Sequence, residues 1–391
     1  MKKRKRCICN TIKLLRQITG EPKPLKRHEI NTIRFELFTE KNSDGTHYLV
    51  LKGNDIYDRY KHRITDADIQ AICRHVKTSP KLIVKLDLSY NDITDAGFFK
   101  LIKRLLIKGR SSVASLNIMN NELTETSILN LAKYATFFKL KCLRLNGNDF
   151  GLKGGEYFAD FLKNNVSVEY CDVGETNISL TSLAHIITAL RRDYNGNETV
   201  KVIDLSRIVP LFNRYSYETK WLAYHIEYLL ERNSTIIELH LQKNQFIGHD
   251  MEYFVRGLRR NNTLVYLDLG YNRIGDYGAE LLGLYLKENP QLVLLNIADD
   301  GIINLLHTLK KSFYLRFFNL WGNKIGHSSC EIIERMLFSG ALFQHTIDVK
   351  VYEVDGVLHA AYYPNPIPWS RAGYEIFKTD GFGNSLRRIF A

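Results

Sequence analysis

An apolar frame, Leu-x-Leu-x-x-Asn-x-Ile, returns along most of the chain. It occurs at residues 86–93 and again at residues 267–274. With the Asn as a marker, the frame recurs at Asn54, Asn91, Asn121, Asn148, Asn244, Asn272 and Asn323. Three further units keep the apolar positions and change the marker, to Thr176, Ile208 and Asp300. Successive markers are separated by about 28 residues, a repeat length that leaves room for one strand and one full helix in each unit.

Each unit can be interpreted physically. In Leu-x-Leu the two Leu point to one face of a strand and the middle residue points to the other. The marker Asn can bond backbone groups where the strand ends. The following segment has helical spacing, with an apolar stripe made by Phe98, Leu101, Ile102 and Leu105. No unit can bury both of its faces alone, so the pattern predicts stacking into a solenoid.

The strand-to-helix links strengthen this interpretation. Residues 93–97 are Ile-Thr-Asp-Ala-Gly, and residues 274–278 are Ile-Gly-Asp-Tyr-Gly. Over about residues 48–338 the chain resembles the ribonuclease-inhibitor-type leucine-rich-repeat proteins. The resemblance implies an α/β fold, a right-handed horseshoe-shaped solenoid with a parallel sheet on the concave face and helices on the convex face. It implies no single function, because members include an inhibitor, a GTPase activator, actin-filament cappers, immune sensors and ciliary or nuclear scaffolds.

Four parts are expected along the chain. A basic arm and cap at 1–47 precede a solenoid of about ten units at 48–338. Residues 339–363 are expected to form a capping hairpin around Asp355-Gly356, because a repeat array needs its open end covered. Residues 364–391 are expected to be an extended tail, with three Pro followed by well-separated aromatic residues.

The outward positions of the predicted strands form a mildly acidic strip with aromatic residues among polar ones. Such a surface suits a protein partner better than a phosphate backbone. The residues predicted to bind a partner on this concave face are Tyr48, Asp87, Asn117, Arg144, Tyr170, Asp172, Asp204, His240, Tyr266, Asp268, Phe317 and Trp321. The alternative is that Asp between the two Leu is only a solvated position.

The unit at Ile208 departs from the frame, with 36 residues to the next marker. The extra segment contains Pro210 and is rich in aromatic residues. Insertions in repeats form loops on one face, often the binding face. Phe212, Arg214, Tyr215 and Tyr217 are therefore predicted to form a partner-binding central loop. The alternative is that this loop folds back over its own strand ends.

Charge adds a second hypothesis. The chain has a net charge of +12, yet residues 1–34 alone contain eleven Lys or Arg against two Glu, so +9 lies in the arm. The densest run is Lys2, Lys3, Arg4, Lys5 and Arg6. This run suits an acidic protein or RNA, and it also resembles a nuclear-localisation cluster. Basic residues on the predicted helices are expected to be solvated faces.

The compartment and cofactors follow from what is missing in the sequence. No apolar run approaches the roughly 18 residues of a membrane span. The six Cys are scattered without metal-like pairs, which predicts buried free thiols. No cofactor, metal or membrane contact is expected. A cytoplasmic protein is expected, in a cilium or on the cytoskeleton by analogy, with the nucleus as the alternative.

No set of residues is organised for catalysis: there is no phosphate-binding loop and no His-Glu-x-x-His. We expect a non-enzymatic protein-interaction scaffold or adaptor in a larger intracellular assembly, monomeric when isolated. The alternative is a nuclear or nucleolar protein that binds RNA or acidic partners through its arm. A GTPase activator of the Ran-activator type is a remote third choice, since the chain lacks that family's acidic tail.

Overall fold

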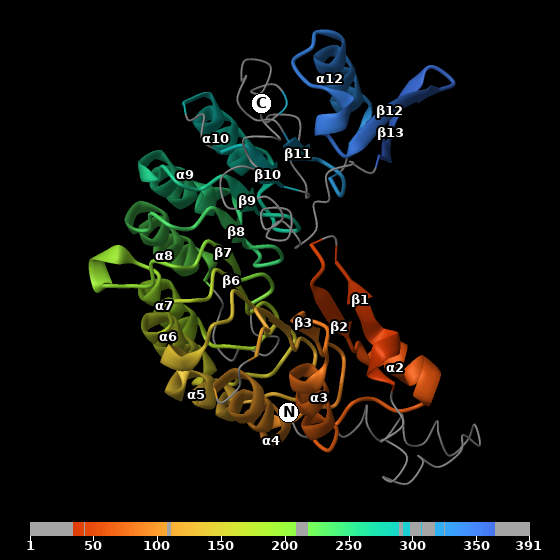
Figure 1. The fold of residues 1–391 in the computed structure, drawn as a ribbon. Helices are drawn as coiled ribbons and strands as arrows, with labels where there is room; N and C mark the ends of the chain where they lie inside the picture. The colour runs from red at the N-terminus through yellow and green to blue at the C-terminus, as the bar shows by residue number, and fades with distance from the viewer. Residues whose placement is uncertain are drawn as a thin grey trace, which may run out of the picture.

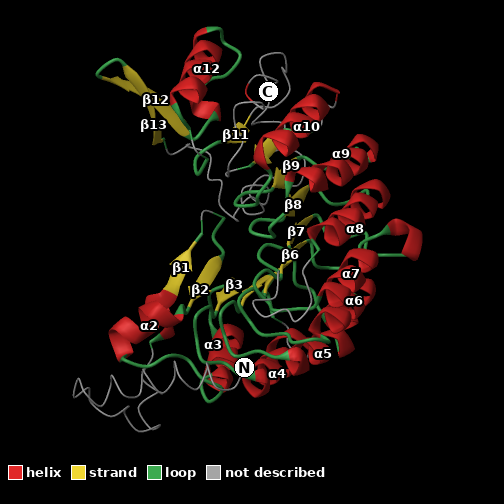
Figure 2. Ribbon diagram, turned by 180° about the vertical axis from the view of Figure 1, so that it is seen from behind, coloured by secondary structure: helices red, strands yellow, loops and turns green. Residues whose placement is uncertain are grey.

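A computed structural model of the chain describes residues 34–42, 44–107, 111–208, 218–288, 292–297, 306, 317–323 and 325–363. Within these residues, one 11-stranded sheet follows chain order from β1 to β11, and a separate hairpin pairs β12 with β13. The sheet lines the inner side of a curved body and the helices follow one another along its outer side (Figure 1). Seen from behind, the same two layers are separated cleanly, strands inside and helices outside (Figure 2).

The strands are short, mostly three residues. They are β1 (Thr39–Lys41), β2 (His47–Val50), β3 (Ile83–Asp87), β4 (Ser115–Asn117), β5 (Cys142–Arg144), β6 (Tyr170–Asp172), β7 (Val202–Asp204), β8 (Glu238–His240), β9 (Tyr266–Asp268), β10 (Leu294–Asn296), β11 (Phe317–Asn319), β12 (Val349–Val354) and β13 (Val357–Tyr362). From β2 to β11 every neighbouring pair is parallel. The predicted solenoid with a parallel sheet is confirmed.

The helices occupy the second half of each unit. They are α2 (Gly53–Tyr60), α3 (Ile69–Thr78), α4 (Asp95–Leu101), α5 (Glu125–Lys133), α6 (Gly154–Asn164), α7 (Leu180–Ala189), α8 (Thr219–Arg232), α9 (Met251–Arg260), α10 (Gly275–Glu288) and α12 (His327–Phe338). The predicted apolar stripe on α4 is wholly buried, and it continues into a π-helical turn at Ile102–Ile107. Within the described residues no helix is both long and apolar enough to cross a membrane.

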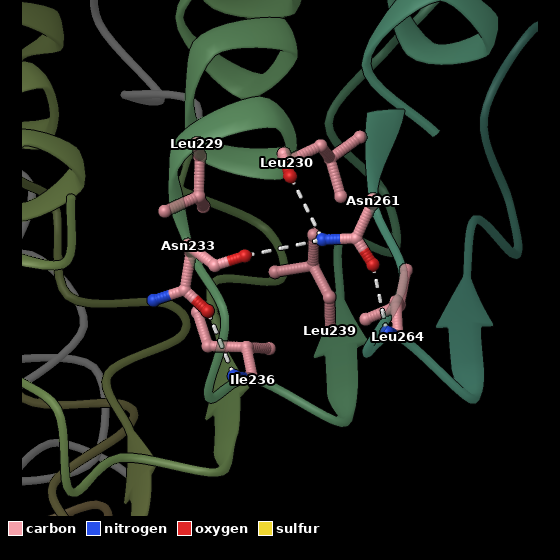
Figure 3. Close-up of a pocket in the computed structure, with 7 residues that line it drawn as sticks. All are labelled: Leu229, Leu230, Asn233, Ile236, Leu239, Asn261 and Leu264. Carbon is pink, nitrogen blue, oxygen red and sulfur yellow. Dashed lines mark hydrogen bonds between the residues drawn. The ribbon is translucent and has the colours of Figure 1, made fainter. Parts of the chain in front are cut away.

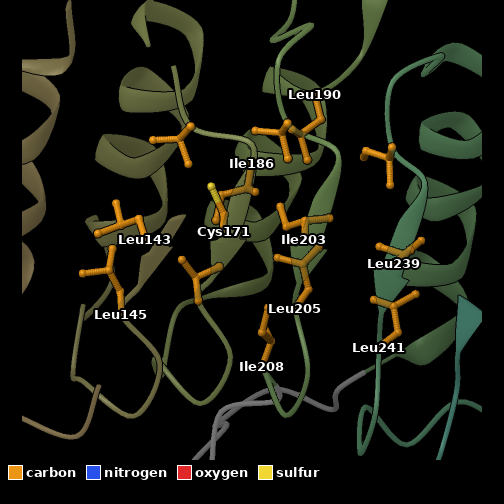
Figure 4. Close-up of a cluster of buried hydrophobic side chains, with 14 of the residues drawn as sticks. Leu143, Leu145, Cys171, Ile186, Leu190, Ile203, Leu205, Ile208, Leu239 and Leu241 are labelled. Atoms are coloured by element: carbon orange, nitrogen blue, oxygen red, sulfur yellow. The ribbon is translucent and has the colours of Figure 1, made fainter. Parts of the chain in front are cut away.

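The core is a continuous stack of apolar side chains between sheet and helices. Leu143 and Leu145 from one unit are followed by Cys171, then Ile203 and Leu205, all almost fully buried (Figure 4). Ile208 is also buried and points into this stack, so its apolar side chain fills the marker position as core. The described Cys residues, Cys73, Cys142, Cys171 and Cys330, are buried thiols that form no disulfide with one another.

The marker Asn side chains form the predicted ladder. Asn91 donates from Nδ2 to Leu51 O at 2.8 Å and Leu88 O at 3.0 Å, and its Oδ1 accepts from Ile64 N at 3.0 Å. Each such side chain thus joins one strand end to the next. Asn54 is the exception: it lies exposed in α2, because the first unit enters its helix at Gly53. The expectation that Asn54 acts as a marker is wrong.

A second Asn ladder lies at the other end of the units, where each helix turns into the next strand. Asn165, Asn197, Asn233 and Asn261 are all buried there. Asn261 Nδ2 donates to Leu230 O at 2.7 Å, while its Oδ1 accepts from Thr263 N at 3.0 Å and Leu264 N at 2.7 Å. These Asn begin Asn-x-Ser/Thr triplets that resemble glycosylation signals, yet their amides are used inside the fold.

The two ends of the sheet differ from its middle. β1 is an antiparallel edge strand on β2 that the sequence pattern did not predict. At the other end β12 and β13 form the antiparallel hairpin expected around Asp355-Gly356, both of which have positive φ (51° and 76°) as a two-residue turn requires. Asp348 takes the marker role there, accepting from Leu320 N at 2.7 Å and Trp321 N at 3.1 Å.

Candidate protein-interaction surface

The parallel register places the outward residues of the strands in two rows on the concave face. The row at the strand starts contains Lys85, Ser115, Cys142, Tyr170, Val202, Glu238, Tyr266 and Leu294. The row at the strand ends contains Asp87, Asn117, Arg144, Asp172, Asp204, His240, Asp268, Asn296 and Asn319. The predicted strip is therefore contiguous from strand to strand. Its role in binding a partner stays a prediction.

Most carboxylates in the second row are held by their own backbone. Asp87, Asp172, Asp204 and Asp268 each accept, through Oδ1, the amide N–H two residues ahead, at 2.9–3.2 Å. This bond closes the turn after each strand. The Asp residues are thus structural as well as charged, and they are almost fully buried rather than solvated.

A buried charge cluster lies on β8 and β9. His240 Nδ1 is 3.2 Å from Asp268 Oδ2, and His240 Nε2 is 3.4 Å from Glu238 Oε2. Burial opposes the charged imidazole. The bonds to Asp268 and Glu238 and the nearby Asp204 outweigh that effect and raise the pKa of His240 to about 10. At neutral pH His240 is therefore a cation between two carboxylates.

Further donors converge on the same carboxylate. Gln242 Nε2 lies 2.5 Å from Asp268 Oδ2, and Asn296 Nδ2 lies 2.8 Å from Oδ1. The Tyr266 hydroxyl is 3.3 Å from Oδ2. Burial and the charge of Asp268 raise the pKa of Tyr266, so the phenol stays protonated and donates. The Asp268 carboxylate is thereby held in place by hydrogen bonds from residues on β8, β9 and β10.

Arg144 organises the middle of the strip. Its guanidinium lies over the Tyr170 ring, 5.2 Å from the centroid. Burial works against its charge, but Tyr170, Cys142 and Asp172 raise the pKa of Arg144 above its ordinary value. Tyr170 itself packs with Cys142 and Val202 in a small apolar cluster apart from the main core. The tyrosine ring is a packing element, with only 1% of its surface exposed.

The expectation of an exposed strip needs correction. Tyr170, Tyr266 and His240 are almost fully buried, because the strands are short and neighbouring side chains bond one another across them. Tyr48 and Arg144 are partly exposed. Among the predicted concave residues whose side chains are described, Trp321 has the greatest exposure, 41%, and its ring lies 5.7 Å from that of Tyr362.

Some of the predicted residues cannot be placed. The backbone of Phe317 is described and its side chain is not. The central loop residues Phe212, Arg214, Tyr215 and Tyr217, the whole basic arm including Lys2, Lys3, Arg4, Lys5 and Arg6, and the tail from residue 364 lie outside the described residues. Those predictions stay as they were.

A neighbouring row of exposed and half-buried residues escaped the sequence interpretation. The residue just before each marker has positive φ in unit after unit: Tyr90, Asn120, Glu175, Arg207, Lys243 and Tyr271. Tyr271 and Tyr90 are 53% and 40% exposed. Glu175 and Arg207 pair at 2.9 Å, and Lys243 lies over the Tyr271 ring. The sequence marks this row, because each of its residues directly precedes a marker position. The left-handed backbone conformation that they share turns their side chains to one edge.

The convex face is less basic than its composition suggests. Arg256 bonds Glu227 with two atoms at 2.9 Å, Arg259 bonds Glu288 at 2.8 and 3.0 Å, and Arg260 reaches Glu231 at 3.0 Å. These pairs link α8 to α9 and α9 to α10. These three guanidiniums are part-exposed and paired with carboxylates, whereas the Arg191 side chain is only 12% exposed.

A small cavity lies between α8 and the strands after it (Figure 3). It is lined by Leu229, Leu230, Asn233, Ile236, Leu239, Asn261 and Leu264. Its volume of about 10 Å³ has room for no more than one water molecule. Figure 3 shows the second Asn ladder passing through its wall, with Asn261 bonded to Leu230. The cavity is a packing defect and no ligand site.

Metal chemistry has no support in the described part of the chain, where no three His, Cys, Asp or Glu are placed to hold an ion. Cys73 and Cys171 are not activated either. Burial raises the pKa of Cys73 to about 11 and also raises that of Cys171. Their thiols therefore stay protonated at neutral pH.

A comparison with known protein families agrees with the repeat. A family model described as Leucine Rich repeat matches residues 81–101, 138–159 and 260–283. The solved structure of the leucine-rich-repeat-containing protein LegL7 from Legionella pneumophila is similar with 15% identity and a TM-score of 0.45, over 70% of this chain and 84% of that one. An internalin (inlF) from Listeria monocytogenes is similar with 17% identity and a TM-score of 0.34, over 64% of this chain and 71% of that one. No curated protein matches the sequence.

The ribonuclease-inhibitor type stays a prediction from the sequence, since the matched model describes leucine-rich repeats in general. The matched repeats, the ten parallel strands and the helices that alternate with them identify the chain as a leucine-rich-repeat solenoid.

Proposed function

We propose that this solenoid is a non-enzymatic protein-interaction scaffold whose partner binds the concave face. Leucine-rich-repeat proteins in general bind other proteins. The proposal made for this chain is that the binding site lies on the concave face. The observation that supports it best is the exposed Trp321 ring at the end of a rigid, acid-rich strip. Trp is enriched among the few interface residues that dominate binding energy.

The strip supports this proposal through its charge. Its rows contain five carboxylates, from Asp87, Asp172, Asp204, Glu238 and Asp268, against the cations Lys85, Arg144 and His240. The carboxylates are fixed by backbone and side-chain bonds, so they add a constant negative field with little freedom to rearrange. Such a field favours basic partner side chains and sets orientation more than affinity.

The edge row extends the surface beyond the strands. Tyr271 and Tyr90 add exposed aromatic area, and Glu175 with Arg207 adds a polar pair. We propose that the partner contacts this edge together with Trp321, since exposed residues and not the buried network are available for contact. The buried side chains of the strip then influence the partner through the shape of the surface and its negative electrostatic field.

The experiment compares two Trp variants of the full chain as baits for affinity purification. Trp321→Ala removes the concave ring, and Trp221→Ala removes a convex ring on α8 of similar exposure, 41% against 37%. We expect a stable protein set that the wild type and Trp221→Ala retain and Trp321→Ala loses. Retention by all three baits, or loss only with Trp221→Ala, contradicts the proposed site.

The assembly and compartment rest on the sequence alone. We propose an intracellular assembly, with a ciliary or cytoskeletal complex in the cytoplasm as the example that fold analogy suggests. The alternative of a nuclear protein binding RNA or acidic partners depends on the arm. The convex ion pairs weigh against a general polyanion surface, because the Arg256, Arg259 and Arg260 guanidiniums already have carboxylate partners.

A further inference from the structure

The hairpin β12–β13 has two outer edges, and its hydrogen-bond pattern shows which backbone groups face them. Tyr363 N donates to Asp348 O at 3.0 Å, so these two residues form a bonded pair. In an antiparallel ladder bonded pairs recur at every second residue. The next bonded pairs are therefore Lys350 with Ala361, Tyr352 with His359, and Val354 with Val357. The last of these closes the two-residue turn, as such a turn requires.

The residues between those pairs direct their N–H and C=O groups outward. On β12 these are Val349, Val351 and Glu353, and on β13 they are Leu358, Ala360 and Tyr362. Two contacts confirm this assignment: Gln344 Nε2 donates to Val349 O at 2.8 Å, and Leu358 N donates to His327 Nδ1 at 3.0 Å. Part of the β13 edge is thus engaged by α12.

Among the described residues, none covers the outer half of the β12 edge. Val351 and Glu353 form no hydrogen bond at this edge to any residue that the structure describes. The hairpin also projects away from the rest of the body (Figures 1 and 2). One of its faces is exposed and combines apolar with polar residues: Tyr352 is 45%, Val354 48% and Val357 45% exposed, and Lys350 and His359 lie on the same face. An edge of this kind beside a partly apolar face is a template for strand addition, and a two-stranded ribbon gains stability from a third strand.

We infer that a second copy of this chain pairs with the edge, β12 against β12, antiparallel about a two-fold axis. The outward N–H and C=O groups of one β12 strand must pair with the outward groups of the other, and only a few registers allow this. Centring on Val351 pairs Glu353 with Val349, whose carbonyl Gln344 already occupies. Centring on Glu353 places two like charges opposite and pairs Val351 with the turn residue Asp355, which has positive φ. Centring on Tyr352 has neither fault.

In that register Val351 of each copy exchanges both backbone bonds with Glu353 of the other, four bonds in all. The Tyr352 side chains meet on the axis, and Lys350 lies beside the other copy's Val354 and the acidic turn at Asp355. The Tyr352 faces of the two hairpins become one continuous face across a four-stranded sheet. The pairing thus occupies an edge that no described residue covers, and it replaces the expected monomer by an end-to-end dimer with two concave faces. This inference does not depend on the proposed function.

The first test is the oligomeric state of the full chain by sedimentation equilibrium over a range of concentrations. Val351→Pro removes an outward N–H and leaves the bonds to β13 intact, since proline is tolerated on such an edge. Ala360→Pro is the matched control, because it removes an outward N–H from the other edge. We expect a concentration-dependent dimer in the wild type and in Ala360→Pro. Val351→Pro loses two of the four bonds and should weaken it by roughly tenfold or more.

The second test is independent of proline and of hairpin stability. In a background with Cys7 and Cys9 replaced by Ser, Tyr352→Cys brings two thiols together on the axis, at a Cα separation of about 4.5 Å that a disulfide accepts. Lys350→Cys is the control, since its two copies lie roughly 14 Å apart in this register. Mild oxidation should produce a covalent dimer only with Tyr352→Cys.

A chain that stays monomeric at every concentration overturns the inference. So does equal weakening by Val351→Pro and Ala360→Pro, or cross-linking of Lys350→Cys as readily as Tyr352→Cys. A monomer that loses another protein only with Val351→Pro also overturns it, in favour of strand addition by that protein.

Discussion

His240 on β8 and Asp268 on β9 form a buried ion pair, with His240 Nδ1 3.2 Å from Asp268 Oδ2 and both side chains almost fully enclosed. A second carboxylate, from Glu238, lies 3.4 Å from the other ring nitrogen. The concave face is therefore cross-linked at its centre by a cation. Removing that cation leaves two buried carboxylates without the positive charge that offsets the free-energy cost of their burial.

Stability should depend on pH through this residue. The folded pKa of His240, about 10, exceeds its ordinary value of 6.5, so protonation favours the folded state. The stabilisation is complete below about pH 6.5, declines as pH rises and is absent above about pH 10. We expect urea denaturation of wild type and His240→Gln to differ most at low to neutral pH and to converge towards pH 10. The exposed His249→Gln serves as the control, and the same curve for both variants would contradict the assignment.

At neutral pH, His240→Ala should destabilise the solenoid by about 3–5 kcal/mol, the range for removing one partner of a buried ion pair. The free energy of unfolding from denaturant titration measures it. A loss below about 1 kcal/mol would mean that the cluster is more hydrated than its burial implies.

Asn165 and Asn164 are neighbours with opposite roles, which makes them a matched pair. Asn165 Nδ2 donates to Ala135 O at 2.8 Å, and its Oδ1 accepts from Ser167 N and Val168 N. Asn164 is exposed and bonds only Asp160 O within its own helix. Asn165→Ala should cost roughly 1–3 kcal/mol for each buried group left unpaired, and Asn164→Ala should be nearly neutral. Thermal denaturation of the two variants checks this difference.

Gly53 marks the close approach of the first unit to the second. A Cβ there would lie 1.7 Å from Tyr90 O, a backbone atom that cannot move alone. We expect Gly53→Ala to destabilise the N-terminal units by at least about 3 kcal/mol, beyond ordinary overpacking. Gly326→Ala, with nothing within 4 Å, is the control. Hydrogen exchange should show the loss in β2 and α2 first, and unchanged protection there would count against this reason.

The repeat frame was sufficient to predict the solenoid. Leu86 and Leu88 lie on one face at the end of a strand, and Phe98 and Leu101 lie on one face of the following helix. Both apolar faces are buried when successive units stack. The frame failed at Asn54, because helix α2 already begins at Gly53 in the first unit. The Asn-x-Ser/Thr triplets could not be interpreted as a ladder, since their bonds reach carbonyls about 30 residues away.

Exposure was the other failure. Alternation correctly assigned Tyr170 and Asp204 to the concave face, yet it could not show that neighbouring strands would bury them. Burial there depends on contacts such as Arg144 with Tyr170, which form only when separate units stack. The order of residues along one strand contains no such information.

The central claim is that a protein partner occupies the concave face and its edge. Hydrogen exchange of the purified complex against the free chain tests it most directly, because it locates the footprint without any substitution. The account predicts slower exchange in the strand and turn peptides of the concave side, including those with Tyr271 and Trp321, and no change in α8 and α9. Protection confined to the α8 and α9 helices, with the concave peptides unchanged, would contradict it.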